Sequence, residues 1–432
     1  MEKRILLTSV KRISCILLAF SMIALQACVN TVEDCVDIKG DNPTIATQNL
    51  NELGAEELRE MKAQLQTAGI EVSDIEIQEE DASTRGYINE RLLRVIKVTT
   101  KSQHPADPNR TVDLSGVLLV PKKTSRQLRL VVAPVPTYTN NDHAPSKLFQ
   151  EMCLFSNGTL NYLYFWTLQA YQGFAVLLPD YPGYGDSYQQ CFIPYLVQKP
   201  MVKSTIDLTK AAQQVLTNEG YKYKSEIIAT GYSQGAFVAT ALARELDTNT
   251  SHNLPIKLLV AGGTPANLKY IAETVIGSEE FRSLYLMAYA ICGYHSNGYS
   301  NINISDILKE PYASEVYNYF DGTQSDFTDI FPCKISDLFT QDIIDNFNNS
   351  KYQYLRNILE ENSIQPWKNK CKMTMVHGTR DITVDYENAK GFVQDQKDAG
   401  GKVTFVSVPW GNHVSTAIRY YSYATASLLL NR

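Results

Sequence analysis

From about residue 92 onward, short and almost continuous apolar runs alternate with amphipathic segments. The runs, which predict strands, cover residues 128–135, 174–178, 226–230, 256–261, 372–376 and 403–408. Runs of this kind are expected of strands buried on both faces, as in a parallel sheet. The segments with helical periodicity cover residues 203–217, 236–246, 387–399 and 414–430. Strand and helix alternate, so the sequence predicts an α/β fold.

Two further β-rich runs precede these elements. They cover residues 92–100 and 112–121 and are joined by a polar turn at 106–109, which predicts an antiparallel pair. Ahead of them lies a polar N-terminal extension, residues 28–85. Within it, apolar positions at helical spacing predict an amphipathic helix over 51–69 that ends at Gly69.

One interval interrupts the alternation of strands and helices. About a hundred residues, rich in Tyr, Phe, Ile and Asn, separate the strand ending near 263 from the strand starting at 372. A structureless loop of this length is implausible. We therefore predict a helical subdomain over 269–368, inserted into a core formed by 86–268 and 369–432.

The first 27 residues have the layout of a secretory signal peptide. A basic start is followed by an apolar run over 13–26, which is too short to span a bilayer as a mature helix. The sequence Leu25-Gln26-Ala27-Cys28 resembles the lipobox of bacterial lipoproteins, in which the cysteine is acylated. We expect an exported lipoprotein at the cell envelope or outer surface, with plain secretion after cleavage at Ala27 as the alternative.

Composition narrows the possible partners. The chain of 432 residues is 44% hydrophobic and 20% charged, with a net charge of -6 and no basic block, so nucleic-acid binding is not expected. Membrane attachment would come only from acyl chains at Cys28, because a polybasic face is lacking.

Six cysteines lie beyond the signal region: Cys35, Cys153, Cys191, Cys292, Cys333 and Cys371. An even number in an exported chain permits up to three disulfides, with buried free thiols as the alternative. Their spacing matches no zinc site, and we expect neither a metal nor a cofactor.

The sharpest local motif is Gly231-Tyr232-Ser233-Gln234-Gly235, directly between a predicted strand and a predicted helix. This is the context of a G-x-S-x-G elbow, where a tight turn strains the serine and glycines let neighbouring backbones approach. The helix N-terminus favours an anionic intermediate beside the serine. We therefore predict that Ser233 is a nucleophile.

A serine nucleophile needs a base and an acid that orients the base. His413 follows the last strand and opens the C-terminal helix, a position where α/β sites are built. His377 ends a buried strand and is better explained as a structural histidine. Asp381 follows the preceding strand and is the predicted acid, whereas its rival Asp385 reads as a helix N-cap.

These motifs follow the chain order of the α/β-hydrolase fold, with Ser233, Asp381 and His413 in succession. The stretch 180–187, Asp-Tyr-Pro-Gly-Tyr-Gly-Asp-Ser, resembles the turn after strand four of that superfamily. Over residues 92–432 the chain is most similar to secretory lipases and related bacterial esterases, which share a Gly-Tyr-Ser-x-Gly elbow. The resemblance implies a mostly parallel central sheet with a helical lid inserted between strands six and seven.

The chain departs from this family at the oxyanion hole. Where the family commonly has a His-Gly pair after strand three, residues 135–139 read Val-Pro-Thr-Tyr-Thr. The backbone N–H of Gln234 is expected to supply one donor. The second donor is the N–H of Thr137 or Tyr138, or a side-chain hydroxyl; equally, the Tyr138 side chain only lines the pocket.

The resemblance implies hydrolysis of carboxylic esters through an acyl-enzyme. The substrate is an acylglycerol, a small soluble ester or an acyl group on a polysaccharide, and the apolar segment 284–291 either forms an acyl pocket or fills the core of the lid. Two alternatives remain: a serine peptidase of the same fold, and a surface-anchored binding protein on an inactive hydrolase scaffold.

Overall fold

The computed structural model describes residues 47–53, 93–122, 124–150, 165–166, 169–170 and 172–432. Within them lies a sheet of nine strands in the order β1-β2-β3-β5-β4-β6-β7-β8-β9. The strands are β1 Thr47–Leu53, β2 Leu93–His104, β3 Asp107–Pro121, β4 Leu130–Val132, β5 Ala175–Pro179, β6 Ile227–Tyr232, β7 Ile256–Gly262, β8 Lys372–Gly378 and β9 Val403–Val408. From β5 to β9 all neighbours are parallel, and the pairs β1–β2, β2–β3 and β3–β5 are antiparallel.

The predicted α/β fold with a mostly parallel sheet is confirmed, and its apolar runs become the strands of the core. Every residue of β5 and β6 is buried, as expected for central parallel strands. β9 is different because it lies at the sheet edge, where its residues are half-buried or exposed. The expectation of burial on both faces is therefore wrong for β9, because an edge strand has a neighbour on one side only.

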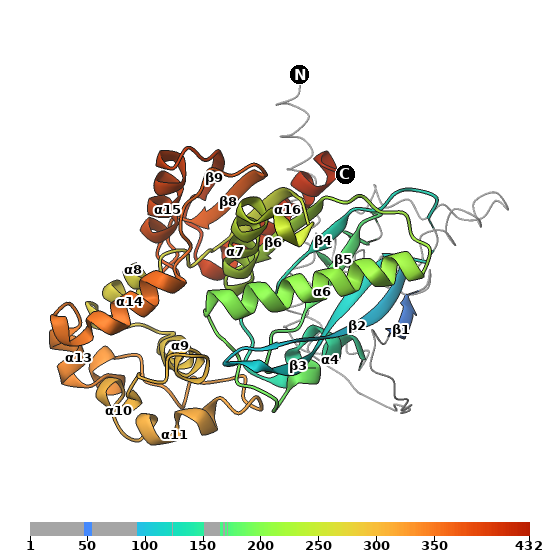
Figure 1. Ribbon diagram of the computed structural model, residues 1–432. Helices are drawn as coiled ribbons and strands as arrows, with labels where there is room; N and C mark the ends of the chain where they lie inside the picture. Colours follow the sequence, from blue (N-terminus) through green and yellow to red (C-terminus); the bar gives the residue numbers. More distant parts are fainter. Residues whose placement is uncertain (1–46, 54–92, 123, 151–164, 167–168, 171) are drawn as a thin grey trace, which may run out of the picture.

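Helices cover both faces of the sheet (Figure 1). The core helices are α4 Pro145–Gln150, α6 Gln198–Asn218, α7 Gln234–Thr248, α15 Tyr386–Asp398 and α16 His413–Leu430. α6 packs against β2 and beside α7, which covers β6 and β7, whereas α16 packs against β7 and β8. The carboxyl ends of the parallel strands thus open toward the starts of α7 and α16.

The predicted insertion consists of short helices between β7 and β8, which are the sixth and seventh strands when counted from β2. These helices are α8 Leu268–Ile276, α9 Leu284–Ser296, α10 Ile304–Ile307, α11 Tyr312–Tyr319, α12 Ile335–Leu338, α13 Gln341–Asn346 and α14 Gln353–Asn362. Figure 1 shows them gathered at one end of the molecule, with α8 and α14 side by side. The first and last of these helices therefore connect the insertion to the sheet.

Several expectations for the N-terminal part lie outside the described residues. They include the signal peptide, the lipobox at Cys28 and most of the extension. The helix predicted over 51–69 is wrong for residues 51–53, which belong to β1 and pair with β2, because strand pairing there overrides the local pattern. Along the described segments, no helix combines the length and the apolar character needed to cross a membrane.

The four described cysteines are free thiols: Cys191, Cys292, Cys333 and Cys371. A framework of three disulfides is therefore wrong, and the alternative of free thiols holds for these four. Cys292 in α9 and Cys371, directly before β8, are buried in different parts of the hydrophobic core, where they pack as small apolar side chains. Cys35 and Cys153 lie outside the described residues.

Candidate active site

Ser233 lies at the tight turn between β6 and α7 with φ 56° and ψ -123°, a conformation that non-glycine residues rarely adopt. The flanking glycines make this turn possible. A Cβ on Gly231 would lie 2.2 Å from the carbonyl oxygen of Gly235, and one on Gly235 would lie 2.1 Å from the carbonyl oxygen of Pro134. Close approach between the elbow and the end of β4 thus requires glycine at both positions.

His413 is the first residue of α16, and a reciprocal capping interaction fixes the start of this helix. The Asn412 side chain accepts a hydrogen bond from the N–H of Ser415 at 2.8 Å, and the Ser415 hydroxyl accepts one from the N–H of Asn412 at 3.0 Å. The Tyr232 hydroxyl donates to the carbonyl oxygen of His413. Held in this way, His413 places its Nε2 3.0 Å from Oγ of Ser233.

Asp381 contacts the other side of the same imidazole ring. Its Oδ2 lies 2.7 Å from Nδ1 of His413, and its side chain is fully buried. Its Oδ1 accepts hydrogen bonds from the N–H groups of Thr383 at 3.0 Å and Val384 at 2.9 Å. Both carboxylate oxygens are therefore occupied, and the carboxylate can orient the imidazole and balance a positive charge on it.

The two rival side chains have other partners. His377 is buried and its Nε2–H donates to the carbonyl oxygen of Val384 at 2.8 Å, with Oδ2 of Asp381 at 3.5 Å. Burial lowers the pKa of His377, which keeps the ring neutral. Asp385 caps α15 by accepting a hydrogen bond from the N–H of Glu387 at 2.8 Å. Neither of the two side chains lies in the chain of contacts to Ser233.

The oxyanion candidates lie around the same elbow. Within the described part of the chain, no acceptor takes a hydrogen bond from the N–H of Gln234, Thr137 or Tyr138. The hydroxyls of the last two residues are already engaged. The Tyr138 hydroxyl accepts from the N–H of Tyr181 at 3.0 Å, and the Thr137 hydroxyl pairs with the Tyr195 hydroxyl at 3.2 Å. The three backbone N–H groups are thus available donors, and the Tyr138 hydroxyl, which only accepts in its contact with Tyr181, keeps its own proton to donate.

An aromatic contact that the sequence did not reveal joins the insertion to this region. Tyr289 of α9 pairs its hydroxyl with that of Tyr184 at 2.5 Å and lies 3.5 Å from the carbonyl oxygen of Tyr138. Its ring centroid is 4.5 Å from that of Tyr195. The only signal for such a cluster was the high tyrosine content of the insertion, which specifies no partner.

Asp180 explains how the turn after β5 is held. Its buried carboxylate accepts hydrogen bonds from the Ser115 hydroxyl and, at 2.9 Å, from the N–H of Ser146. Asp186 forms an ion pair with Lys97 at 2.6 Å. Neither aspartate contacts Ser233 or His413, so both brace the loop beside the site.

No group of three or more His, Cys, Asp or Glu side chains that could hold a metal occurs in the segments that the structure describes.

The sheet order, the serine elbow and the helical insertion after the sixth strand define an α/β hydrolase. The solved structures it resembles agree. The rice cell wall degrading esterase LipA from Xanthomonas oryzae is 22% identical with a TM-score of 0.71, over 90% of this chain and 97% of that one. Candida antarctica lipase A in its closed state is 16% identical with a TM-score of 0.58, over 75% and 74%. A putative hydrolase from Legionella pneumophila is 21% identical with a TM-score of 0.69, over 79% and 89%.

A family model described as secretory lipase matches residues 162–428, and the chain belongs to this family. The resemblance to secretory lipases is therefore confirmed, and the protein is a carboxylic ester hydrolase of the serine hydrolase type. The family's description agrees with an exported protein. No match was found among curated proteins.

Proposed function

We propose that Ser233, His413 and Asp381 form the catalytic triad of this ester hydrolase. The supporting observation is the continuous chain of contacts from Asp381 Oδ2 through both nitrogens of His413 to Ser233 Oγ, at 2.7 and 3.0 Å. The strained backbone of Ser233 at the start of α7 points to the same role. This combination of a nucleophile, a base and an oriented acid is what acyl transfer requires.

In the proposed reaction, Ser233 Oγ attacks the ester carbonyl carbon while His413 Nε2 takes the hydroxyl proton. The tetrahedral intermediate then collapses, the bond to the alkoxy oxygen breaks, and His413 returns the proton to the departing alcohol. Water attacks the acyl-enzyme with the same base and releases the carboxylic acid. The Asp381 carboxylate accepts the hydrogen bond from Nδ1–H of His413 and stabilises the imidazolium.

We place the oxyanion at the free backbone donors of Gln234 and of Thr137 or Tyr138. One donor of this kind is worth about 10²–10³ in rate, because it is aimed at charge that develops only in the transition state. The Tyr138 hydroxyl accepts from the N–H of Tyr181, which supports a structural role for this side chain, and its own proton makes it the remaining candidate for the second donor.

We also propose that the insertion 269–368 acts as a lid on the core formed by 86–268 and 369–432. The contact of the Tyr289 hydroxyl with the carbonyl oxygen of Tyr138 supports this proposal, because it joins α9 to a residue of the proposed oxyanion hole. Acylglycerols, small esters and acyl groups on polysaccharides remain the candidate substrates. The last class agrees with the name of the rice cell wall degrading esterase from Xanthomonas oryzae.

The test is Ser233→Ala beside the wild type, with p-nitrophenyl esters of graded chain length and a panel of aminoacyl amides. We expect ester hydrolysis by the wild type, labelling by a fluorophosphonate probe, and loss of both in the variant by several orders of magnitude. Faster cleavage of the amides would indicate a peptidase. A folded wild type that is neither labelled nor active would indicate an inactive binding scaffold.

For localisation, we propose acylation at Cys28 after removal of residues 1–27, because the sequence from Leu25 to Cys28 resembles a lipobox. Two or more acyl chains at this residue would anchor the protein stably at a membrane. Cys28→Ser should release the protein from the membrane fraction or block its processing. Mass spectrometry that finds an unmodified N-terminus at another residue would refute the anchor and leave the catalytic proposal untouched.

A further inference from the structure

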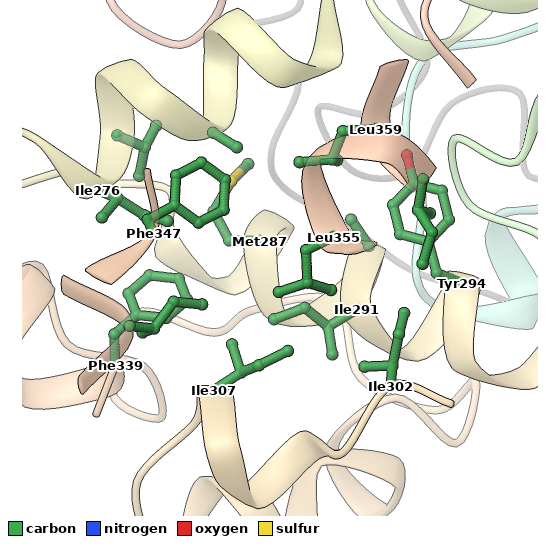
Figure 2. Close-up of a pocket in the computed structure, with 15 residues that line it drawn as sticks. Ile276, Met287, Ile291, Tyr294, Ile302, Ile307, Phe339, Phe347, Leu355 and Leu359 are labelled. Atoms are coloured by element: carbon green, nitrogen blue, oxygen red, sulfur yellow. The ribbon is translucent and has the colours of Figure 1, made fainter. Parts of the chain in front are cut away.

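The helical insertion contains an apolar cavity of its own (Figure 2). It lies between α8, α9, α10, α13 and α14, and it holds about 580 Å³ of space not filled by protein atoms, part of which is open to solvent. Because this cavity is partly open to solvent, a ligand can enter it from outside.

The lining of this cavity offers no polar group to a ligand. Figure 2 shows aliphatic and aromatic side chains directed toward one another, among them Ile276, Ile307 and Phe347. The one hydroxyl in the lining belongs to Tyr294, and it donates to the carbonyl oxygen of Leu196. An apolar ligand is favoured in such a cavity, because its binding removes apolar surface of both the ligand and the lining from water. Only a hydrocarbon fits this chemistry.

The cavity and the proposed active site lie on opposite faces of α9. Met287, Ile291 and Tyr294 follow the spacing of one helical face and line the cavity. Tyr289, two residues and about 200° of helical turn from Met287, contacts Tyr138 on the other face. The helix itself thus separates the two regions.

We propose that this cavity binds the aliphatic chain of a fatty acid at a site separate from Ser233. The occupant follows from two observations: the lining accepts hydrocarbon only, and a carboxylic ester hydrolase of the secretory lipase family releases carboxylic acids. The carboxylate stays at the open side, where the partly exposed side chains of Ile276, Met287 and Leu359 lie.

The test uses the full-length Ser233→Ala protein and the fatty acid cis-parinaric acid, which fluoresces in apolar surroundings. We expect saturable binding of one molecule per chain and a higher melting temperature with ligand, because a ligand that binds only the folded state stabilises it. Ala272→Phe and Ile276→Trp each fill the cavity from α8 and should weaken binding at least tenfold. Thr274→Phe, at an exposed position of the same helix, is the matched control and should bind like the parent.

Three outcomes would overturn the proposal, and the first two are no saturable binding and unchanged binding in both cavity-filling variants. A third is loss of binding after a fluorophosphonate blocks Ser233 in the wild type, which would make the cavity part of the catalytic pocket. Hydrolysis of p-nitrophenyl acetate by the Ala272→Phe variant, otherwise wild type, should be unchanged. Failure of the triad proposal is seen separately, because it appears in the acetate assay and not in fatty-acid binding.

Discussion

Replacing Asp381 with asparagine tests the orientation of the proposed base without removing any heavy atom. The asparagine carbonyl oxygen can still accept from the N–H groups of Thr383 and Val384, at the 3.0 and 2.9 Å contacts seen for the carboxylate. The amide NH₂ then faces Nδ1 of His413, 2.7 Å from the present oxygen. This arrangement stabilises the tautomer that carries its proton on Nε2. In that form His413 donates toward Ser233 and cannot take its proton.

The expected loss is therefore catalytic. In a well-studied serine protease, the same change lowers kcat by about 10⁴ through the wrong tautomer. Such a loss corresponds to about 5 kcal/mol of transition-state stabilisation at 1.36 kcal/mol per factor of ten. The measurement is kcat and kcat/KM for p-nitrophenyl butyrate near neutral pH, together with the melting temperature. The melting temperature should change little, because the buried loop keeps its two backbone hydrogen bonds.

Asp385→Asn is the matched control. Asp385 is the N-cap of α15, and asparagine caps helices about as well as aspartate. This variant should keep wild-type activity and stability. If Asp385→Asn abolishes turnover while Asp381→Asn retains it, the acid has been assigned to the wrong residue.

Three further changes test other parts of the site. Gly235→Ala puts a Cβ 2.1 Å from a backbone carbonyl oxygen at the end of β4, and it should lower stability by about 1–3 kcal/mol and the rate about a hundredfold. The control Gly391→Ala has open space around it and should be neutral or stabilising. Equal effects of the two changes on melting temperature and turnover would contradict this. Tyr138→Phe removes the hydroxyl that accepts a hydrogen bond from the N–H of Tyr181, so it should lower the free energy of unfolding by about 1–3 kcal/mol with little change in kcat. A stable but inactive variant would give the hydroxyl a catalytic role. The pKa of His377 is lowered in the folded state, so below the ordinary pKa of about 6.5 the unfolded chain binds more protons than the folded chain. The free energy of unfolding therefore decreases as the pH is lowered, by up to about 1.4 kcal/mol per pH unit. Denaturant unfolding at pH 7.5, 6.5 and 5.5 should show a smaller acid loss in His377→Gln than in the wild type, and parallel losses would exclude this histidine as the source.

The sequence by itself determined the features that depend on neighbours along the chain. Apolar runs bounded by turns became β5, β6 and β7, because a strand buried on both faces needs an apolar side chain at nearly every position. The glycines around Ser233 predicted the elbow, because the restriction at Gly231 comes from its near neighbour Gly235, although the one at Gly235 comes from Pro134 on another segment. Chain order placed Asp381 and His413 after successive strands, so both had to reach the same edge of the sheet.

Only the tertiary structure decided which distant groups meet. His377 and His413 both lie at or after the end of an apolar run in the sequence. Only packing leaves His377 buried beside Asp381 and brings Nε2 of His413 to 3.0 Å from Oγ of Ser233. No local sequence pattern predicts that Tyr289 of the insertion contacts Tyr138 of the core. Nor does one predict that α9 is apolar on two faces because one face packs on the core and the other lines a cavity. The contacts of Tyr289 with Tyr138 and of His413 with Ser233 join residues more than a hundred positions apart. Their energies depend on packing between whole elements, which the preferences of a local segment do not encode.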